Sequence, residues 1–286
     1  MVAGQARIAV VTDSTAYLPD ETADQAGLTV VPLSVTIAAT QGREGVDVTP
    51  AQVARALEAR RVAVTTSRPS PGEFAQVYRR LLDGGAAGVV SVHISGELSG
   101  TYEAARMGAA ELGGRVEVVD SRSTGMGLGF PALAAAQAAA EGADLLAVRA
   151  AAVAVIGRTT TLFYVDTLEF LRRGGRIGAA SAMLGTALSV KPILRVTNGV
   201  IVVRDKVRTA GRALDRLVEL AVEAAGESDV DVAVHHLAAP QRAAALAEAI
   251  SDRLGSRIRH CYLTEVGAVV GAHVGPGLAS IVVYRH

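Results

Sequence analysis

Small hydroxyl residues and glycines gather at one joint in the sequence, the stretch HISGELSGTYEAA at 93–105. There an apolar run that ends at Ile94 gives way to a helical pattern, and Ser95 and Ser99 lie in the joint. A glycine-rich turn between a strand and a helix leaves backbone N–H groups at the positive end of the helix dipole, which suits an anion. The joint has no lysine and the chain has no GxxxxGK[ST] motif, so the expected anion is not a nucleoside triphosphate.

A second group of hydroxyls lies in the stretch VTTSRPSPGEF, where Thr65, Thr66 and Ser67 end a β-type run. Further along, Ser70 before Pro71 is typical of a helix N-cap, and this structural role explains both residues. It does not explain the hydroxyls upstream. At strand ends hydroxyls either bind ligands or cap turns, and the sequence leaves both roles open for Thr65 and Thr66.

Charged and titratable side chains occur in two glycine-rich stretches. In LEFLRRGGRIG, Arg172 and Arg173 precede a glycine pair, which is typical of a helix that ends with cations at its negative pole. In VVGAHVGPGLA, His273 stands in apolar surroundings, where an isolated histidine is more often a hydrogen-bonded structural group than a functional one. Arg176 lies past the helix end, so a helix end does not explain it.

Other chemistries have less support in the sequence. No GxSxG nucleophile elbow is present, although Ser95, Asp120 and His273 could converge as a hydrolase triad. His235 and His236 are adjacent on a predicted strand and would point to opposite faces, so they form a poor metal pair. The stretch GMGLGF has the wrong glycine register for a dinucleotide-binding turn. We therefore expect no metal and no nucleotide cofactor.

The composition restricts the partners of the chain. Its 286 residues include 28 basic and 28 acidic side chains, which removes the positive surface that binding to nucleic acid or to an anionic membrane normally needs. No apolar stretch approaches the roughly 20 residues that span a bilayer. The single Cys261 forms no internal disulfide and the N-terminus lacks a secretory pattern, so a cytoplasmic protein is expected. Because aromatic residues make up only 3%, an internal ligand site would have aliphatic walls suited to a flexible hydrocarbon.

Apolar β-branched runs alternate with helical patterns over the first half of the chain, which predicts an α/β fold with a buried parallel sheet. One of these predicted strands is LTVVPLSV, residues 28–35. Polar residues follow several of the runs, and in open parallel sheets ligands bind outside the carboxyl ends of the strands. These residues are Thr12, Asp13, Ser14, Thr15, Ser95, Asp120, Ser121 and Ser123.

The pattern changes after about residue 157. The pair Asn198-Gly199 between two apolar runs predicts a β-hairpin, and hence an antiparallel element in the second half of the chain. We therefore expect two domains: an N-terminal parallel-sheet α/β domain at residues 1–157, and a C-terminal α/β domain with a mixed or antiparallel sheet at residues 158–286.

Several blocks, in this order, resemble the DegV family. They are VTDSTAYLP, TTSRPSPGEF, ISGELSGTY, VVDSRSTGMGLG, VDTLEFLRRGGRIG, KPIL and GAHVGPG, and they extend from Val11 to Gly277. The resemblance implies a two-domain DegV-like fold that encloses one long-chain fatty acid between its domains. It also implies a non-catalytic subunit of a bacterial fatty acid kinase, which presents the carboxylate of its ligand to a separate ATP-dependent kinase subunit for acyl-phosphate formation.

By the same resemblance, hydroxyls of two blocks and the histidine of GAHVGPG hold the carboxylate, and the last arginine of RRGGRIG lies near the head group or at the rim that faces the kinase. These residues are Thr65 or Thr66, Ser95 or Ser99, His273 and Arg176. The chain departs from the family pattern at three places. Arg68 replaces a usual glutamine, Gly96 replaces a usual second serine, and Ala279-Ser280 interrupts a glycine-rich ending.

The energetics of burial agree with a binding role for such a ligand. Each buried methylene contributes about 0.8 kcal/mol, so about fourteen of them give on the order of 11 kcal/mol, against about 4 to 15 kcal/mol for association. A charged hydrogen bond adds roughly 1.5 to 3 kcal/mol, so the head-group contacts mainly orient the acid. Two alternatives stay open: a lipid esterase or thioesterase that uses Ser95 or Ser99 with His273, and a lipid-sensing regulatory protein.

Overall fold

The chain folds into two compact units, each with its own sheets. The first unit comprises the chain up to Leu33 and Arg68–Gly157, and the second comprises Ser34–Ser67 and Arg158–His286. The segment Ser34–Ser67 thus packs with the second unit, although it lies inside the region expected to form the first domain. The computed structural model describes residues 7–19, 21–59, 62–183 and 190–286.

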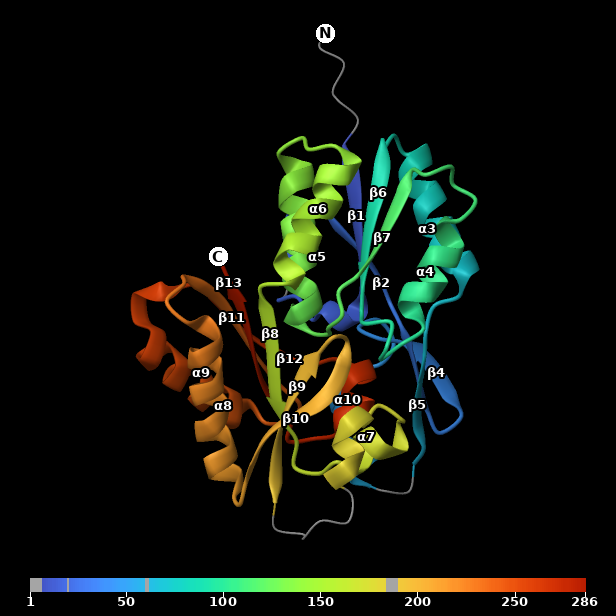
Figure 1. Ribbon diagram of the computed structural model, residues 1–286. Coiled ribbons are helices and arrows are strands. Elements are labelled where there is room, and N and C mark those ends of the chain that lie inside the picture. The colour runs from blue at the N-terminus through green and yellow to red at the C-terminus, as the bar shows by residue number, and fades with distance from the viewer. Residues whose placement is uncertain (1–6, 20, 60–61, 184–189) are drawn as a thin grey trace. The chain divides into compact units, whose positions relative to one another are not determined.

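A parallel sheet forms the centre of the first unit, with α5 and α6 on one face and α3 and α4 on the other (Figure 1). Its four strands run in the order β2-β1-β6-β7 and confirm the predicted parallel-sheet α/β fold. The elements of this unit are β1 (Ile8–Asp13), the 3-10 turn η1 (Ser14–Ala16), α1 (Thr22–Gln25), β2 (Leu28–Val31), α3 (Pro71–Asp83), β6 (Gly88–His93), α4 (Thr101–Ala109), β7 (Val116–Asp120), α5 (Met126–Ala140) and α6 (Leu145–Ile156).

Both faces of this sheet are buried, which is why its central strands are continuous apolar runs in the sequence. On β1, Val10 packs with residues of α5 and α6, whereas the next residue, Val11, packs with residues of α3 and α4. Helix α3 begins where the sequence predicts it. The Ser70 side chain accepts a hydrogen bond from the backbone N–H of Glu73, and the Glu73 carboxylate accepts one from the N–H of Ser70.

The larger sheet of the second unit is mixed, as predicted for the C-terminal half. Its six strands run in the order β10-β9-β8-β13-β11-β12, and only the β11–β12 pair is parallel. Helices α8 and α9 bury their apolar sides against it. The elements are β8 (Thr159–Tyr164), α7 (Glu169–Arg173), η2 (Gly178–Met183), β9 (Lys191–Thr197), β10 (Val200–Val207), α8 (Ala210–Ala225), β11 (Val230–His236), α9 (Pro240–Leu254), η3 (Gly255–Arg257), β12 (Ile258–Glu265), α10 (Ala268–Val274) and β13 (Ala279–Arg285).

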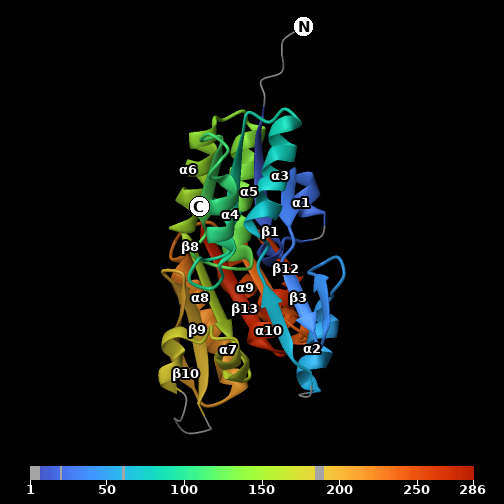
Figure 2. The same ribbon diagram turned by 90° about the vertical axis from the view of Figure 1, so that its right-hand side faces the viewer.

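A smaller antiparallel sheet, in the order β4-β3-β5, also belongs to the second unit (Figure 2). Helix α10 contacts β3, β5, α2 and α7. The elements of this segment are β3 (Ser34–Ile37), β4 (Thr40–Arg43), α2 (Pro50–Glu58) and β5 (Val64–Ser67). A helix near the end of the chain therefore packs on a sheet formed by an early segment.

One predicted strand is wrong, and one predicted turn is confirmed. The run at residues 28–35 divides at Pro32 into β2 and β3, which join different sheets. Proline has no backbone N–H to donate to a ladder, so it interrupts the pairing at that point. The turn at Asn198-Gly199 does connect the antiparallel strands β9 and β10, and both residues have positive φ, 53° and 86°.

Candidate functional site

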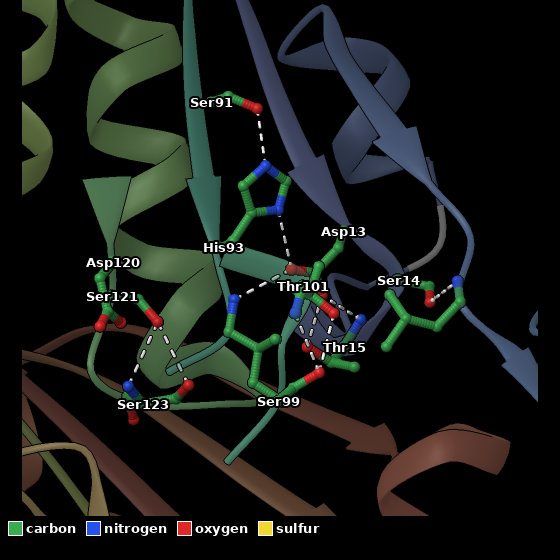
Figure 3. A network of polar contacts seen from close by, with 12 residues as sticks. Asp13, Ser14, Thr15, Ser91, His93, Ser99, Thr101, Asp120, Ser121 and Ser123 are labelled. Carbon is green, nitrogen blue, oxygen red and sulfur yellow. Dashed lines mark hydrogen bonds and ion pairs between the residues drawn. The ribbon is translucent and has the colours of Figure 1, made fainter. Parts of the chain in front are cut away.

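The carboxyl ends of the parallel strands in the first unit bring polar side chains together, as the sequence predicts (Figure 3). In the pairing of β1 with β6, Thr12 is opposite Val92, so Asp13 and His93 end neighbouring strands. In the pairing of β6 with β7, His93 is opposite Asp120. A cluster of polar groups therefore forms at one edge of this sheet.

Asp13 is the centre of this cluster. Its Oδ1 accepts hydrogen bonds from the backbone N–H of Thr15 at 3.0 Å and from the Thr15 hydroxyl at 2.5 Å. Its Oδ2 accepts from the N–H of Ile94 at 2.9 Å and is 3.0 Å from Nδ1 of His93. Asp13 and His93 have no exposed surface, and a buried carboxylate is stable only when such donors surround it.

A chain of hydrogen bonds leads from Tyr78 to Asp13. The Tyr78 hydroxyl donates to Oγ of Ser91 at 2.9 Å, and this Oγ is 2.7 Å from Nε2 of His93. If the Ser91 hydroxyl in turn donates to Nε2, Nδ1 of His93 carries the proton toward Asp13, and every donor in the chain points the same way. Burial raises the pKa of Tyr78, which keeps its hydroxyl protonated as a donor.

Ser91, His93 and Asp13 are connected as in a hydrolase triad, but solvent and substrates cannot reach them. None of the three side chains has exposed surface, and Tyr78 occupies the hydroxyl that would act as nucleophile. A nucleophile needs a position where a substrate atom can reach it. This network therefore supports the turn after β6 rather than catalysis.

Ser95 and Ser99 have structural partners within the first unit. Ser95 is buried, and its Oγ accepts a hydrogen bond from the N–H of Glu97 at 3.2 Å. Oγ of Ser99 is 2.8 Å from the hydroxyl of Thr101 and accepts from the N–H of Thr101 at 3.3 Å, at the start of α4. Ser99 thus binds the first amide of α4, but the N-cap residue is Gly100, which has no side chain to cap the helix. A role in ligand binding stays a prediction for both serines.

Gly96 is one of the three positions where the chain departs from the family pattern, and its surroundings leave little room for a side chain. Its N–H donates to Oδ2 of Asp120 at 3.3 Å, and a Cβ at this position would lie 3.3 Å both from that oxygen and from Cδ1 of Tyr102. Such spacing is tighter than ordinary van der Waals contact, so a side chain here requires its neighbours to move. Glycine at 96 thus keeps Asp120 close to the turn that carries Ser95.

In the second unit, the structure brings Thr66 and His273 together. Oγ1 of Thr66 lies 2.9 Å from Nε2 of His273, which is 207 residues further along the chain. Side chains alternate between the two faces of a strand, so Thr65, the other candidate on β5, points to the opposite face and is exposed. Of the two threonines that the sequence leaves open, only Thr66 contacts the candidate histidine.

The surroundings of His273 keep its ring neutral. Burial, together with the nearby positive charge of Arg176, lowers the pKa of His273 from 6.5 to about 4. The side chain of Arg176 itself donates to the carbonyl oxygen of Gly174. Nδ1 of His273 is buried and has no hydrogen-bond partner among the described residues. Of the site residues predicted in this unit, Thr66 and His273 are therefore in direct contact. Arg176 binds the carbonyl oxygen of Gly174, which lies next to the His273 ring.

The two glycines after α7 have different structural roles. Gly175 has φ of 70°, the left-handed conformation that ends a helix. Gly174 has an ordinary φ of −74°, but a Cβ on it would lie 2.1 Å from Nδ1 of His273. Gly174 is therefore required for close packing against the ring, a role that the sequence analysis missed because a glycine pair at a helix end already has a local explanation.

Arg172 and Arg173 have the local role that the sequence indicates. Both guanidinium groups pair with the carboxylate of Glu169, each at 2.7 Å. The two arginines lower the pKa of Glu169 to about 2. All three residues belong to the exposed side of α7, so they need no ligand to explain them.

Metal and membrane features were sought over the described parts of the chain. No group of three or more His, Cys, Asp or Glu side chains there is arranged to hold a metal ion. His235 binds the hydroxyl of Thr264 at 2.7 Å, while His236 lies 3.7 Å from a carboxylate oxygen of Glu265. Among the helices of residues 7–19, 21–59, 62–183 and 190–286, none has both the length and the apolar character to cross a membrane.

These features define a two-unit α/β protein in which histidine–hydroxyl pairs occupy the candidate sites. The chain belongs to the DegV family, because the family model described as "Uncharacterised protein, DegV family" matches residues 7–286. A DegV domain-containing protein of Streptomyces coelicolor is 50% identical over 276 residues, which cover 96% of this chain and 98% of that protein.

Solved structures of the same family have the same fold. A DegV family protein from Thermus thermophilus, described as fatty acid binding, superposes with a TM-score of 0.93 at 35% identity, over 98% of this chain and 100% of that one. DegV from Bacillus subtilis, described as a fatty acid binding protein, superposes with a TM-score of 0.88 at 32% identity, again over 98% and 100%. The predicted two-domain DegV-like fold is therefore confirmed.

Proposed function

We propose that this protein binds one long-chain fatty acid and holds its carboxylate at Thr66 and His273. The observation that carries the proposal is the Thr66–His273 pair, in which a hydroxyl and a neutral ring meet beside an arginine. The fatty-acid-binding relatives from Thermus thermophilus and Bacillus subtilis support it, since they match almost the whole chain. The scarcity of aromatic residues, 3% of the chain, also suits an aliphatic ligand.

The direction of the hydrogen bonds favours Thr66 as the group that touches the carboxylate. A carboxylate accepts hydrogen bonds, so the Thr66 hydroxyl would donate to it and accept from Nε2–H of His273. In that tautomer Nδ1 carries no proton. Nδ1 has no partner among the described residues, so this tautomer leaves an acceptor unpaired rather than an N–H donor.

Arg176 would supply the positive charge. Because the pKa of His273 is about 4, its ring is neutral at pH 7 and cannot balance a carboxylate. A partly buried anion needs a cation or several donors nearby. Support for Arg176 comes from its hydrogen bond to the carbonyl oxygen of Gly174, the residue that packs against the His273 ring. We propose Ser95 or Ser99 as a further hydroxyl that contacts the ligand.

In this proposal the protein is a carrier in the cytoplasm and not an enzyme. The apolar chain supplies most of the affinity, and the polar contacts decide which end of the acid is presented. The partner that would use this orientation is an ATP-dependent fatty acid kinase, which phosphorylates the carboxylate to an acyl phosphate. The support for the kinase is the resemblance of the motif blocks to those of the kinase-associated members of the family.

Extraction of the purified protein tests the binding step. Mass spectrometry of an organic extract should detect about one fatty acid per chain, and adding the acid back to delipidated protein should raise its melting temperature. Thr66→Val should weaken binding about fivefold, the effect of about 1 kcal/mol, whereas Thr65→Val on the opposite face of β5 serves as the matched control. The proposal is disproved if the purified protein contains no lipid and its melting temperature does not change when fatty acids are added.

A further inference from the structure

Glu44 is a buried carboxylate that lies outside the residues proposed to bind the ligand. It follows β4 directly, and only 5% of its surface is exposed. Its Oε1 accepts a hydrogen bond of 2.7 Å from the backbone N–H of Val269, which is 225 residues further along the chain. Burial of a carboxylate is costly without such donors, so the N–H of Val269 helps to keep Glu44 buried. The question is what this long-range contact does for the helix that contains Val269.

The loop after β4 holds the backbone around Glu44. The N–H groups of residues 46–48 all donate to the carbonyl oxygen of Arg43. The carboxylate of Asp47 accepts hydrogen bonds from the backbone N–H and from Nε of Arg43, both at 2.9 Å. The loop thus closes on itself and turns the Glu44 side chain toward α10.

Helix α10 depends on contacts from elsewhere in the chain. It has seven residues, and Gly267 before it offers no side chain to cap its first amides. Helices of this length are marginal on their own in water. Val269 and His273 are four residues apart, which places them on the same face of the helix. The residue that Glu44 binds and the residue that Thr66 binds are therefore neighbours.

The three-stranded sheet accordingly holds α10 at two points. Glu44, next to β4, binds the first turn of the helix, and Thr66, on β5, binds the His273 ring in its last turn. One helical turn rises about 5.4 Å, so a displacement at Val269 carries His273 with it. Since hydrogen bonds weaken steeply with distance and angle, a small displacement of α10 is enough to break the contact with Thr66.

A simple helix cap is the alternative explanation, and other helices of this protein show its usual form. Thr209 caps α8 by accepting from the N–H of Arg212 at 3.3 Å, and Asp144 caps α6 by accepting from the N–H of Ala147 at 2.8 Å. Those acceptors precede their donors by three residues and lie at exposed positions. Glu44 differs, because it ties a distant segment to the helix that carries His273.

We propose that Glu44 is a positioning residue: its contact with Val269 places α10 on the β4-β3-β5 sheet so that His273 meets Thr66. This inference rests on the proposed function, in which the Thr66–His273 pair binds a carboxylate. Because the apolar chain contributes most of the affinity, loss of the Glu44 contact weakens binding of a fatty acid more than binding of the alcohol with the same chain.

The experiment compares Glu44→Ala with Thr209→Ala, which removes a cap from another helix of the same unit. Palmitate and 1-hexadecanol are delivered from cyclodextrin to the delipidated protein, and the affinity of each is measured. Glu44→Ala should weaken palmitate about tenfold, which corresponds to about 1.4 kcal/mol, and change 1-hexadecanol by less than about twofold. Thr209→Ala should lower the melting temperature and leave both affinities unchanged.

A second measurement follows His273 without any ligand. The ¹⁵N resonances of its ring report the tautomer and the hydrogen bond to Thr66, and they should change in Glu44→Ala but not in Thr209→Ala. If the wild-type protein binds neither lipid, the proposed function fails, while this change in the resonances still supports the positioning role. Unchanged resonances, or equal losses for acid and alcohol, overturn the inference. If Glu44→Ala does not fold, Glu44→Asp, whose side chain is too short for Val269, takes its place.

Discussion

Two histidine–hydroxyl pairs, Ser91–His93 in the first unit and Thr66–His273 in the second, differ in what surrounds them. Nε2 of His93 lies 2.7 Å from Oγ of Ser91, and Nε2 of His273 lies 2.9 Å from Oγ1 of Thr66. The other ring nitrogen of His93 binds Asp13, whereas that of His273 has no partner in the described part of the chain. The His93 pair is completely buried, and the His273 pair is only partly so.

The comparison shows that residue types alone do not make a reactive or binding site. Ser91, His93 and Asp13 would be a hydrolase triad by composition, yet their hydrogen-bonding capacity is used within the fold. Thr66 and His273 form a less complete set, and this incompleteness suits a ligand that supplies the missing partner. The complete network at Asp13 stabilises a turn, whereas the Thr66–His273 pair has hydrogen-bonding capacity left for a ligand.

The complete network at Asp13 predicts the largest effect on stability. Asp13→Ala would leave the N–H groups of Thr15 and Ile94 and the ring of His93 without their acceptor, at a cost of about 3 to 5 kcal/mol in the free energy of unfolding. Tyr78→Phe removes only the first hydrogen bond of the series from Tyr78 to Asp13, and it should lower the free energy of unfolding by about 1 kcal/mol. Urea unfolding of both variants measures the difference, and equal losses would mean that Asp13 is not the centre of the network.

The Thr66–His273 pair predicts a pH dependence of stability. The pKa of His273 is about 4 in the folded protein, against an ordinary value of 6.5, so the unfolded chain takes up the proton first as the pH falls. The folded state is therefore penalised between about pH 6.5 and pH 4, by up to about 3 kcal/mol at roughly 1.4 kcal/mol per pKa unit.

His273→Gln should remove this penalty, so the delipidated variant should lose less stability than the wild type across that pH window. His235, whose pKa burial also lowers to about 4, is present in both proteins and cancels in the comparison. The check is a series of unfolding curves from pH 7 to pH 4. Parallel pH profiles for the two proteins would show that His273 does not titrate in this way.

The smallest predicted effects are those of alanine substitutions at the two glycines after α7, which should differ in what they change. Gly174→Ala places a Cβ 2.1 Å from Nδ1 of His273, so the ring must move and fatty acid affinity should fall about fivefold, or about 1 kcal/mol. Gly175→Ala meets no atom within 4 Å but strains a left-handed residue, which should cost about 1 kcal/mol of stability and leave affinity unchanged. Equal affinities for the two variants would contradict the packing role of Gly174.

Much of the fold follows from local patterns in the sequence. Ser70 before Pro71 marks the start of α3, Asn198-Gly199 marks the hairpin, and polar residues after apolar runs mark the carboxyl ends of the parallel strands. These signals are readable because capping, turn conformation and burial of a strand each depend on a few adjacent residues. The split at Pro32 was missed because the apolar run continues through it.

The sequence by itself determined the α/β class, the family and the short group of candidate residues, since hydrophobic period, turn chemistry and motif order are properties of neighbouring positions. Only the tertiary structure decided that Thr66 rather than Thr65 meets His273, that Gly174 lies against the ring and that Glu44 binds α10. Each of these depends on which face a side chain takes and on contacts across the chain. A linear pattern contains neither.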